Sequence, residues 1–369
     1  MTFLRNKKIW IIIAAPIVYF ITYISARFPI VTEKFYSTAV YPVLSGVFGR
    51  IFGFFPFSLF EVLLYTIIIS VICYLIVQIK KIVRDKSNKK TYILNLIINS
   101  LVFFSIWYSL FVFTCGINYN RLSFSYHSGL NLRESSYSEL ADLCFELADS
   151  ANDIRKALPN DESGIMKSSF ATPYQTAVYA GKSFANISEK HPILDGYTPR
   201  PKPVLSSKLM SYLNITGIFV PFTYECNVNV DILAFDIPAT MMHELAHYKG
   251  FMREDEANFI SYIACLESEN AEFIYSGTML AFIHSSNALY SVDKDTYYEV
   301  FSTLSDNVLT DIAANSTYWQ QFKGPVAEVA TTVNNTYLQV NRQTDGVKSY
   351  GRMVDLLLAD YRQRHNISE

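Results

Sequence analysis

The residues best suited to chemistry lie in a short run, residues 242–250, which contains the pattern H-E-x-x-H. On a helix, His243 and His247 are four residues apart and share one face, so both imidazoles can bind one zinc ion. Glu244 lies one position round the helix, where its carboxylate can reach a water on the metal and act as a general base. The alternative is a set of ordinary helix-surface residues. We interpret the run as a helical zinc site.

A third ligand is expected shortly after the two histidines. Glu254, Asp255 and Glu256 begin a second predicted helix. Glu254 and Asn258 are four residues apart and share a face, so Glu254 can complete a set of two imidazoles and one carboxylate. Asn258 can then hydrogen-bond a ligand histidine and select its tautomer. Glu256 points to another side of the helix and stays an alternative ligand, and an acidic first turn favoured by the helix dipole is the interpretation without a metal.

These two patterns, H-E-L-A-H and then E-x-x-A-N, resemble the gluzincin metallopeptidases, in which a glutamate of the second helix binds the zinc. The chain is more closely similar to one group, the bacterial membrane proteins of the domain-of-unknown-function 3810 family, which are predicted metallopeptidases. The runs that carry this similarity are 118–121, 201–203, 217–223, 243–247, 254–258 and 349–352. The resemblance implies a zincin-like fold and a Zn²⁺ cofactor, and it implies no particular substrate.

Residues 217–230 carry the best strand signal outside the apolar N-terminal region, because they are rich in β-branched and aromatic side chains. Pro221 confines such a strand to the edge of a sheet. In zincins, an edge strand before the H-E-x-x-H helix pairs with the peptide substrate. The resemblance therefore implies a substrate-binding role for Phe219, Val220, Phe222 and Thr223. A plain hairpin packed on the helices is the alternative.

A zinc peptidase also needs a donor for the oxyanion that forms when water attacks a carbonyl. Tyr350 lies in a run that resembles the family, and it is the predicted donor. Arg352 and His284 are alternatives. An ordinary packing or surface role is the competing interpretation for each of the three.

Three apolar runs near the start of the chain, at about 9–26, 57–79 and 92–115, are each long enough to cross a bilayer. The connection at 28–53 is predicted to be a loop, apart from residues 41–52, which could form an amphipathic helix at the interface. The N-terminus and the 80–91 loop hold nine Lys and Arg, against three in the connection between the first two spans. The positive-inside rule therefore predicts a cytoplasmic N-terminus and an extracytoplasmic segment from residue 118 onward.

Charge and cysteine content limit the possible partners. Residues 1–117 have a net charge of +9 and the whole chain has −2, so residues 118–369 carry −11. An acidic outer part argues against a nucleic-acid partner, which would need a basic face. The five cysteines form no C-x-x-C pair. Buried free thiols are expected, and a bridge among Cys144, Cys226 and Cys265 is left open.

We therefore expect two parts, a membrane region (1–117) with three transmembrane helices and a catalytic domain (118–369). The catalytic domain is expected to be mainly α-helical and zincin-like, with a small sheet. Besides the two metal-binding helices, its predicted helices are 137–158, 173–191, 206–214, 268–290, 293–314, 324–340 and 349–364.

The predicted function is a membrane-anchored zinc metallopeptidase of the gluzincin type. Its expected partners are a peptide or protein substrate outside the membrane and the lipid bilayer itself. Two other classes stay open: a zinc-binding sensor or scaffold of the cell envelope with little hydrolytic activity, and a metal-dependent hydrolase of a non-peptide bond. Glu244 argues against a scaffold, because a site that only binds zinc needs no general base. The polar residues of the zinc-binding helices argue against a site inside the bilayer.

Overall fold

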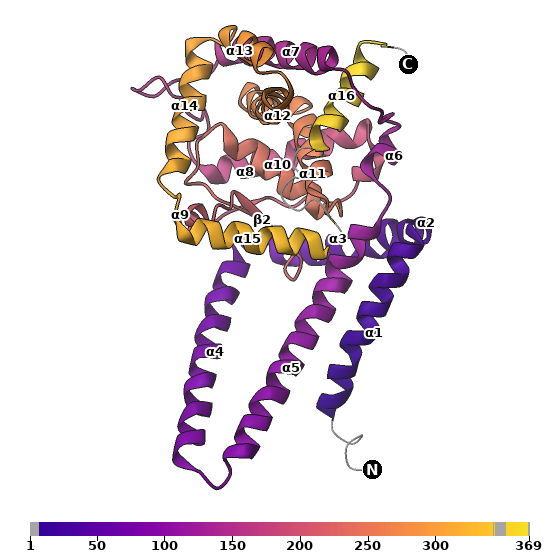
Figure 1. The fold of residues 1–369 in the computed structure, drawn as a ribbon, viewed down its shortest axis with the longest axis vertical. Coiled ribbons are helices and arrows are strands. Elements are labelled where there is room, and N and C mark those ends of the chain that lie inside the picture. Colours follow the sequence, from indigo (N-terminus) through magenta and orange to yellow (C-terminus); the bar gives the residue numbers. More distant parts are fainter. Residues whose placement is uncertain (1–6, 342, 344–351, 368–369) are drawn as a thin grey trace.

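The computed structural model describes residues 7–341, 343 and 352–367, which form a mainly α-helical protein with one small sheet (Figure 1). Three helices are long and apolar enough to cross a membrane: α1 (Lys7–Arg27), α4 (Leu59–Arg84) and α5 (Lys89–Thr114). They match the three predicted spans. All three extend from the same side of the larger outer part, and α4 and α5 form a helical hairpin (Figure 1). Few of their side chains are buried inside the protein, which suits a lipid environment.

The connection between α1 and α4 is helical almost throughout, so the prediction of a loop before residue 41 was wrong. It contains α2 (Pro29–Thr32), the π-helical segment η2 (Glu33–Val40) and α3 (Tyr41–Gly53). The physical reason is a long-range contact. The Glu33 carboxylate accepts hydrogen bonds from the Arg121 guanidinium at 2.6 Å and from the Leu122 backbone N–H at 3.1 Å. These bonds hold the segment against the chain that follows α5.

The outer part consists of helices packed around the small sheet. Its longer helices are α7 (Tyr137–Arg155), α8 (Pro173–Ser183), α10 (Asp236–Tyr248), α11 (Glu254–Leu266), α12 (Ala271–Val292), α13 (Lys294–Ser302), α14 (Asp306–Gln320), α15 (Pro325–Val340) and α16 (Met353–Arg364). The short helical segments are η3 (Gly116–Asn120), α6 (Phe124–Ser128), η4 (Phe184–Glu189), η5 (Pro192–Leu194) and α9 (Ser207–Tyr212). Most predicted helices are therefore present.

The predicted helix 293–314 is instead two helices, α13 and α14. The break lies at residues 303–305, where Asn152 of α7 binds the chain on both sides. Its Nδ2 donates to the Thr303 carbonyl at 2.8 Å, and its Oδ1 accepts from the Ser305 N–H at 2.7 Å. Because these bonds satisfy the backbone groups that a broken helix exposes, the interruption is stable.

The sheet has the order β1–β3–β2, with β1 (Lys202–Pro203) parallel to β3 (Glu225–Val228) and β2 (Gly217–Val220) antiparallel to β3. Residues 217–230 are thus a hairpin rather than one strand. Its turn spans residues 221–224 and contains Pro221, and Tyr224 adopts a left-handed φ of 49°. β2 is an edge strand within the described part of the chain, as Pro221 led us to expect.

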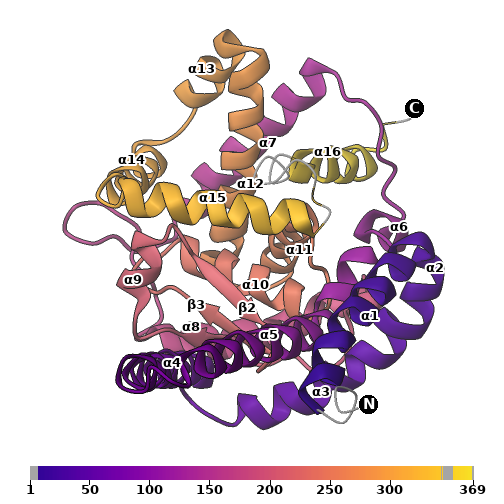
Figure 2. The same ribbon diagram turned by 60° about the horizontal axis from the view of Figure 1, so that its bottom comes forward.

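Helix α10 lies at the centre of the fold, between the sheet and the helices α11 and α12 (Figure 2). Met241, Met242 and Leu245 are completely buried. Helix α3, from the connection between α1 and α4, contributes to the same core, and the Tyr248 hydroxyl donates to its Ser45 carbonyl at 2.6 Å. All five cysteines are free thiols.

Candidate metal centre

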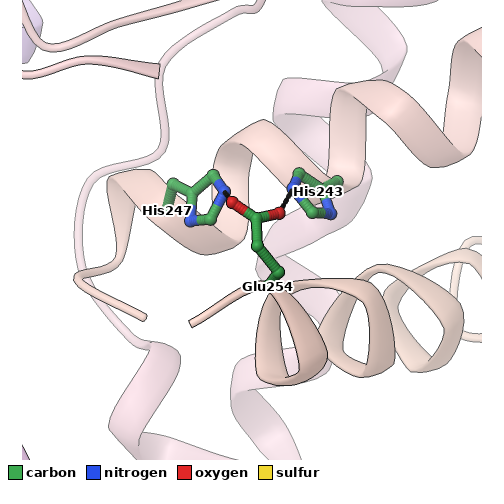
Figure 3. Close-up of side chains that lie close together, drawn as sticks. All are labelled: His243, His247 and Glu254. Atoms are coloured by element: carbon green, nitrogen blue, oxygen red, sulfur yellow. Dashed lines mark ion pairs between the residues drawn. The ribbon is translucent and has the colours of Figure 1, made fainter. Parts of the chain in front are cut away.

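The chain from the end of α10 to the start of α11 reverses at Gly250. This glycine has a φ of 91°, a left-handed conformation that is strained for residues with a Cβ. His243 and His247 lie one turn apart on α10, and their ring centroids are 4.6 Å apart. The reversal places Glu254, the first residue of α11, opposite both rings (Figure 3).

The three side chains form a compact group that could hold a metal ion. The Glu254 carboxylate lies between the histidines, with Oε2 at 3.2 Å from His243 Nε2 and Oε1 at 3.7 Å from His247 Nε2 (Figure 3). Their potential ligand atoms all lie within 4.8 Å of one another. Two imidazoles and one carboxylate are a common ligand set for zinc, and they leave a fourth position for water or substrate.

Each imidazole is oriented by a hydrogen bond at Nδ1, the ring nitrogen that does not face Glu254. His247 Nδ1 is 2.8 Å from the Phe251 carbonyl, which can only accept, so Nδ1 carries the proton. His243 Nδ1 is 2.7 Å from Asn258 Oδ1, which likewise accepts. In a neutral imidazole, the other nitrogen, Nε2, then has a lone pair directed at Glu254. Lone pairs facing a carboxylate repel it unless a proton or a cation lies between them, so this donor arrangement fits a metal.

The electrostatics of the two histidines differ. Burial lowers the pKa of His247 to about 4, so its imidazole is neutral at pH 7. Burial also opposes charge on His243, but the hydrogen bond and the negative charge of Glu254 outweigh it and raise the pKa of His243. Without a metal, His243 is therefore the histidine that more readily takes up a proton beside Glu254. A cation bound to the three residues would replace this proton.

Glu244 lies next to this group and is only 3% exposed. Burial raises the pKa of its carboxyl group to about 8. Its side chain accepts a hydrogen bond from the backbone N–H of Phe219 in β2. Its Oε2 has no hydrogen-bond partner among the described residues. A buried carboxylate oxygen without a partner is unusual in a structural role, and it is available for a proton or a bound water.

Residues 36–358 match the model of a protein family described as "Protein of unknown function (DUF3810)". The chain belongs to this family. Neither curated proteins nor solved structures provide a match. The DUF3810 region extends from η2 to α16, so it includes α10, α11 and the sheet as well as two of the three long apolar helices.

Of the other candidate residues in this DUF3810 protein, the structure describes Glu256, His284 and Arg352. Glu256 points away from the candidate metal centre, because its Oε1 accepts the Phe124 N–H at 2.8 Å. His284 is half-buried on α12, and Arg352 is exposed before α16. Tyr350 lies outside the described residues.

Of the four residues predicted to lie in a substrate-binding strand, two lie in a strand and two in the turn that follows it. Phe219 and Val220 lie in β2. Phe222 and Thr223 lie in the turn 221–224, so the prediction that they belong to the strand was wrong. The physical reason is that the chain folds back on itself there to form β3.

Sequence reasoning missed two residues that shape the site. A Cβ at Gly217 would clash with the Glu244 carboxylate, so the absence of a side chain permits the close approach. Gln343 Oε1 accepts the Glu254 backbone N–H at 3.2 Å and so helps to hold the start of α11. A glycine at the start of a predicted strand can signal close approach of another group, whereas no local pattern points to Gln343.

Proposed function

We propose that this chain is a membrane-anchored zinc metallopeptidase. The observation that carries the proposal is the position of Glu244, a buried carboxylate with an unpartnered oxygen, beside the group of His243, His247 and Glu254. A site that only stores or senses zinc has no need for such a group.

His243, His247 and Glu254 would hold the zinc through two nitrogens and one carboxylate. Zinc bound there would supply Lewis acidity, which makes water more acidic and polarises a carbonyl group. Asn258 and the Phe251 carbonyl accept the Nδ1 protons of the two histidines, which leaves the Nε2 atoms of the neutral imidazoles free to bind the metal. Their role is to pre-organise the ligands.

Glu244 is the proposed general base. In the absence of a cation, its buried carboxyl group is mostly protonated at neutral pH, since its pKa is about 8. A positive charge on the neighbouring ligands favours the carboxylate form, so metal binding would prepare Glu244 to accept a proton. Its Oε2 would take the proton from the attacking water and later pass it to the leaving amine. The backbone N–H of Phe219 also interacts with this carboxyl group and favours its charged form.

The substrate is proposed to bind to β2 by strand addition. Within the described part of the chain, the edge of β2 opposite β3 pairs with no strand. Because Glu244 contacts the backbone of β2 at Phe219, a peptide extended along this edge passes close to the general base. Of the residues predicted from the sequence to bind the substrate, Phe219 and Val220 lie in this strand.

The proposed membrane topology follows from the distribution of basic residues along the chain. We propose a cytoplasmic N-terminus, because the basic residues concentrate at the N-terminus and in the loop between α4 and α5. The outer part, with the zinc group, would then face the extracytoplasmic side.

The test uses the full chain purified in detergent, assayed for metal content and for hydrolysis of a quenched-fluorescent peptide library. Glu244→Gln should retain about one zinc per chain and lose at least about a hundredfold of the peptidase activity, since it removes the general base. Retained activity in Glu244→Gln would refute the proposed mechanism.

Glu254→Gln and Glu256→Gln form a matched pair for the ligand assignment. Glu254→Gln should lose zinc, because it removes a charged ligand, whereas Glu256→Gln should keep it. The reverse result would assign the third ligand to Glu256. A wild-type chain that binds no metal would refute the proposal as a whole.

A further inference from the structure

The strand beside the general base leads towards the membrane-spanning helices. β2 starts at Gly217, against Glu244, and ends at Val220. In the turn that follows, the ring of Phe222 lies 4.3 Å from that of Trp107 in α5. In the view turned towards the side from which the long helices extend, β2 is visible between α15 and the pair α4 and α5 (Figure 2).

Trp107 marks the outer boundary of the bilayer. α5 has 26 residues, which at 1.5 Å per residue span about 39 Å, some 9 Å more than a hydrocarbon core of about 30 Å. Trp107 precedes Thr114, the end of α5, by seven residues, or about 10 Å. With this excess on the outer side, Trp107 lies at the depth where tryptophans favour the membrane interface. The Phe222 turn, which contacts it, reaches the same depth.

Direct hydrogen bonds fix the sheet to the start of α4. The Glu225 carboxylate, from β3, accepts the backbone N–H groups of Leu59 at 3.0 Å and Phe60 at 2.8 Å. In return, the Glu61 carboxylate of α4 accepts the N–H groups of Leu205 at 3.1 Å and Ser206 at 2.9 Å. The sheet therefore cannot move far from the membrane surface without breaking these bonds.

Helix α15 carries an exposed apolar stripe at the same level. Its axis runs across those of α4 and α5, at the height where they enter the outer part (Figure 1). The stripe consists of side chains spaced three or four residues apart, which therefore share one face: Val326, Val329, Val333, Tyr337 and Val340. Val329, Val333 and Val340 are 65%, 63% and 76% exposed.

This stripe faces the membrane side. The ring of Tyr337 lies 6.2 Å from that of Phe111 in α5, so the face that holds Tyr337 turns towards the transmembrane helices. An amphipathic helix of this kind is stable when its apolar face lies in the boundary between headgroups and acyl chains. The bilayer that surrounds α4 and α5 is therefore the surface that covers the stripe.

We infer that the site works at the membrane surface, on the segment of a membrane-anchored polypeptide that directly follows its transmembrane part. The inference rests on the proposed peptidase function. A substrate strand added to β2 has one end near Glu244 and the other at the interface beside Phe222. From Gly217, against Glu244, to Phe222 the strand and turn advance five positions, at most about 17 Å. The cleaved bond should therefore lie within about ten residues of the bilayer, counted along a substrate segment in extended conformation.

The first test measures the position of α15 in the full chain, reconstituted in vesicles of phosphatidylethanolamine and phosphatidylglycerol. A Cys73→Ser background removes the exposed thiol, since the other four cysteines are buried. Val333→Cys, on the stripe, and Thr331→Cys, on another face of the helix, are each labelled with an NBD fluorophore. Lipids with a doxyl quencher in the acyl chain should reduce the fluorescence at position 333 strongly and at position 331 little. Equal quenching at both positions would overturn the placement of α15.

The second test compares two substrates in the same vesicles. One is an unstructured segment of mixed sequence attached to a single transmembrane helix, and the other is the same segment without the helix. Cleavage sites are mapped by mass spectrometry. The anchored segment should be cut at least about tenfold faster, because anchoring raises its local concentration, and its cleavage sites should cluster next to the membrane.

The outcomes of the second test distinguish a failure of the juxtamembrane inference from a failure of the proposed peptidase function. The juxtamembrane inference would be overturned if the wild type cut both segments at equal rates and at scattered sites. If Glu244→Gln then cut neither segment, the proposed peptidase function would still stand. If the zinc-loaded protein cuts neither segment, both claims are overturned.

Discussion

Among single residues, Gly217 and Glu244 depend on each other. Glu244 is buried against β2, and its carboxylate occupies the space that a side chain at position 217 would need. The Phe219 N–H then holds the carboxylate in a defined orientation. A general base must be placed to within a fraction of an ångström, so this glycine is a positioning residue for the proposed reaction.

Gly217→Ala is expected to displace Glu244 and to lower the peptidase kcat on the order of a hundredfold, the usual effect of a small misplacement. Zinc content should stay the same, because Gly217 touches none of the three ligands. Gly324→Ala is the matched control, since no atom lies within 4 Å of an added Cβ and the backbone there is extended. Unchanged kcat in Gly217→Ala would show that Glu244 tolerates the displacement.

Among the elements, the long apolar helix α4 and the sheet stabilise each other. The first backbone N–H groups of a helix lack partners within the helix, and in α4 Glu225 and Ser58 accept three of them. Glu225 also forms a buried ion pair with Lys202, at 3.6 Å. Burial lowers the pKa of Lys202, while the charge of Glu225 acts against that change.

Glu225→Gln should lower the free energy of unfolding by about 3 kcal/mol, because it leaves the buried Lys202 without its counter-charge and weakens the cap of α4. Thermal unfolding in detergent measures the change. Glu189→Gln, on an exposed residue of η4, should stay within about 0.5 kcal/mol of the wild type. A melting temperature of Glu225→Gln equal to that of the control would mean that the carboxylate contributes no net stability.

In the whole molecule, buried polar contacts join the membrane region to the outer part. Glu33, before α3, binds Arg121 at 2.6 Å and lies 3.1 Å from His127 Nε2. Tyr248 of the metal-binding helix reaches the Ser45 carbonyl of α3 at 2.6 Å. The helix that carries His243 and His247 is thus held by the segment between the long apolar helices α1 and α4. We therefore expect the metal site to depend on an intact membrane region.

The Glu33 contacts predict a dependence of stability on pH. Burial acts to raise the pKa of Glu33, but the neighbouring side chains of His127 and Arg121 outweigh it, so its pKa lies below the ordinary value of 4.5. A lowered pKa in the folded state contributes stability above the unfolded pKa, and that contribution is lost as the pH falls through the folded pKa.

Glu33→Gln mimics the protonated side chain. Its melting temperature should therefore be clearly below that of the wild type at about pH 6 and above, and the difference should shrink below about pH 4. Thermal unfolding of both proteins from pH 3.5 to 7 tests this. A difference that is independent of pH would show that the charge of Glu33 does not contribute.

The sequence by itself determined the features that depend on short spacing. Residues four apart on a helix share a face, so the pairing of His243 with His247 and of Glu254 with Asn258 could be predicted without a structure. The three long apolar helices could be predicted as well, because length and composition alone decide whether a helix can span a bilayer.

Only the tertiary structure decided what depends on contacts between distant segments. It directed Glu256 towards Phe124 and away from the histidines, and it divided the helix predicted at 293–314 through Asn152 of α7. It also placed Gly217 against Glu244, 27 positions apart in the chain. Local propensity contains no information about such pairs, because their energy comes from burial and hydrogen bonds that exist only once the chain has folded.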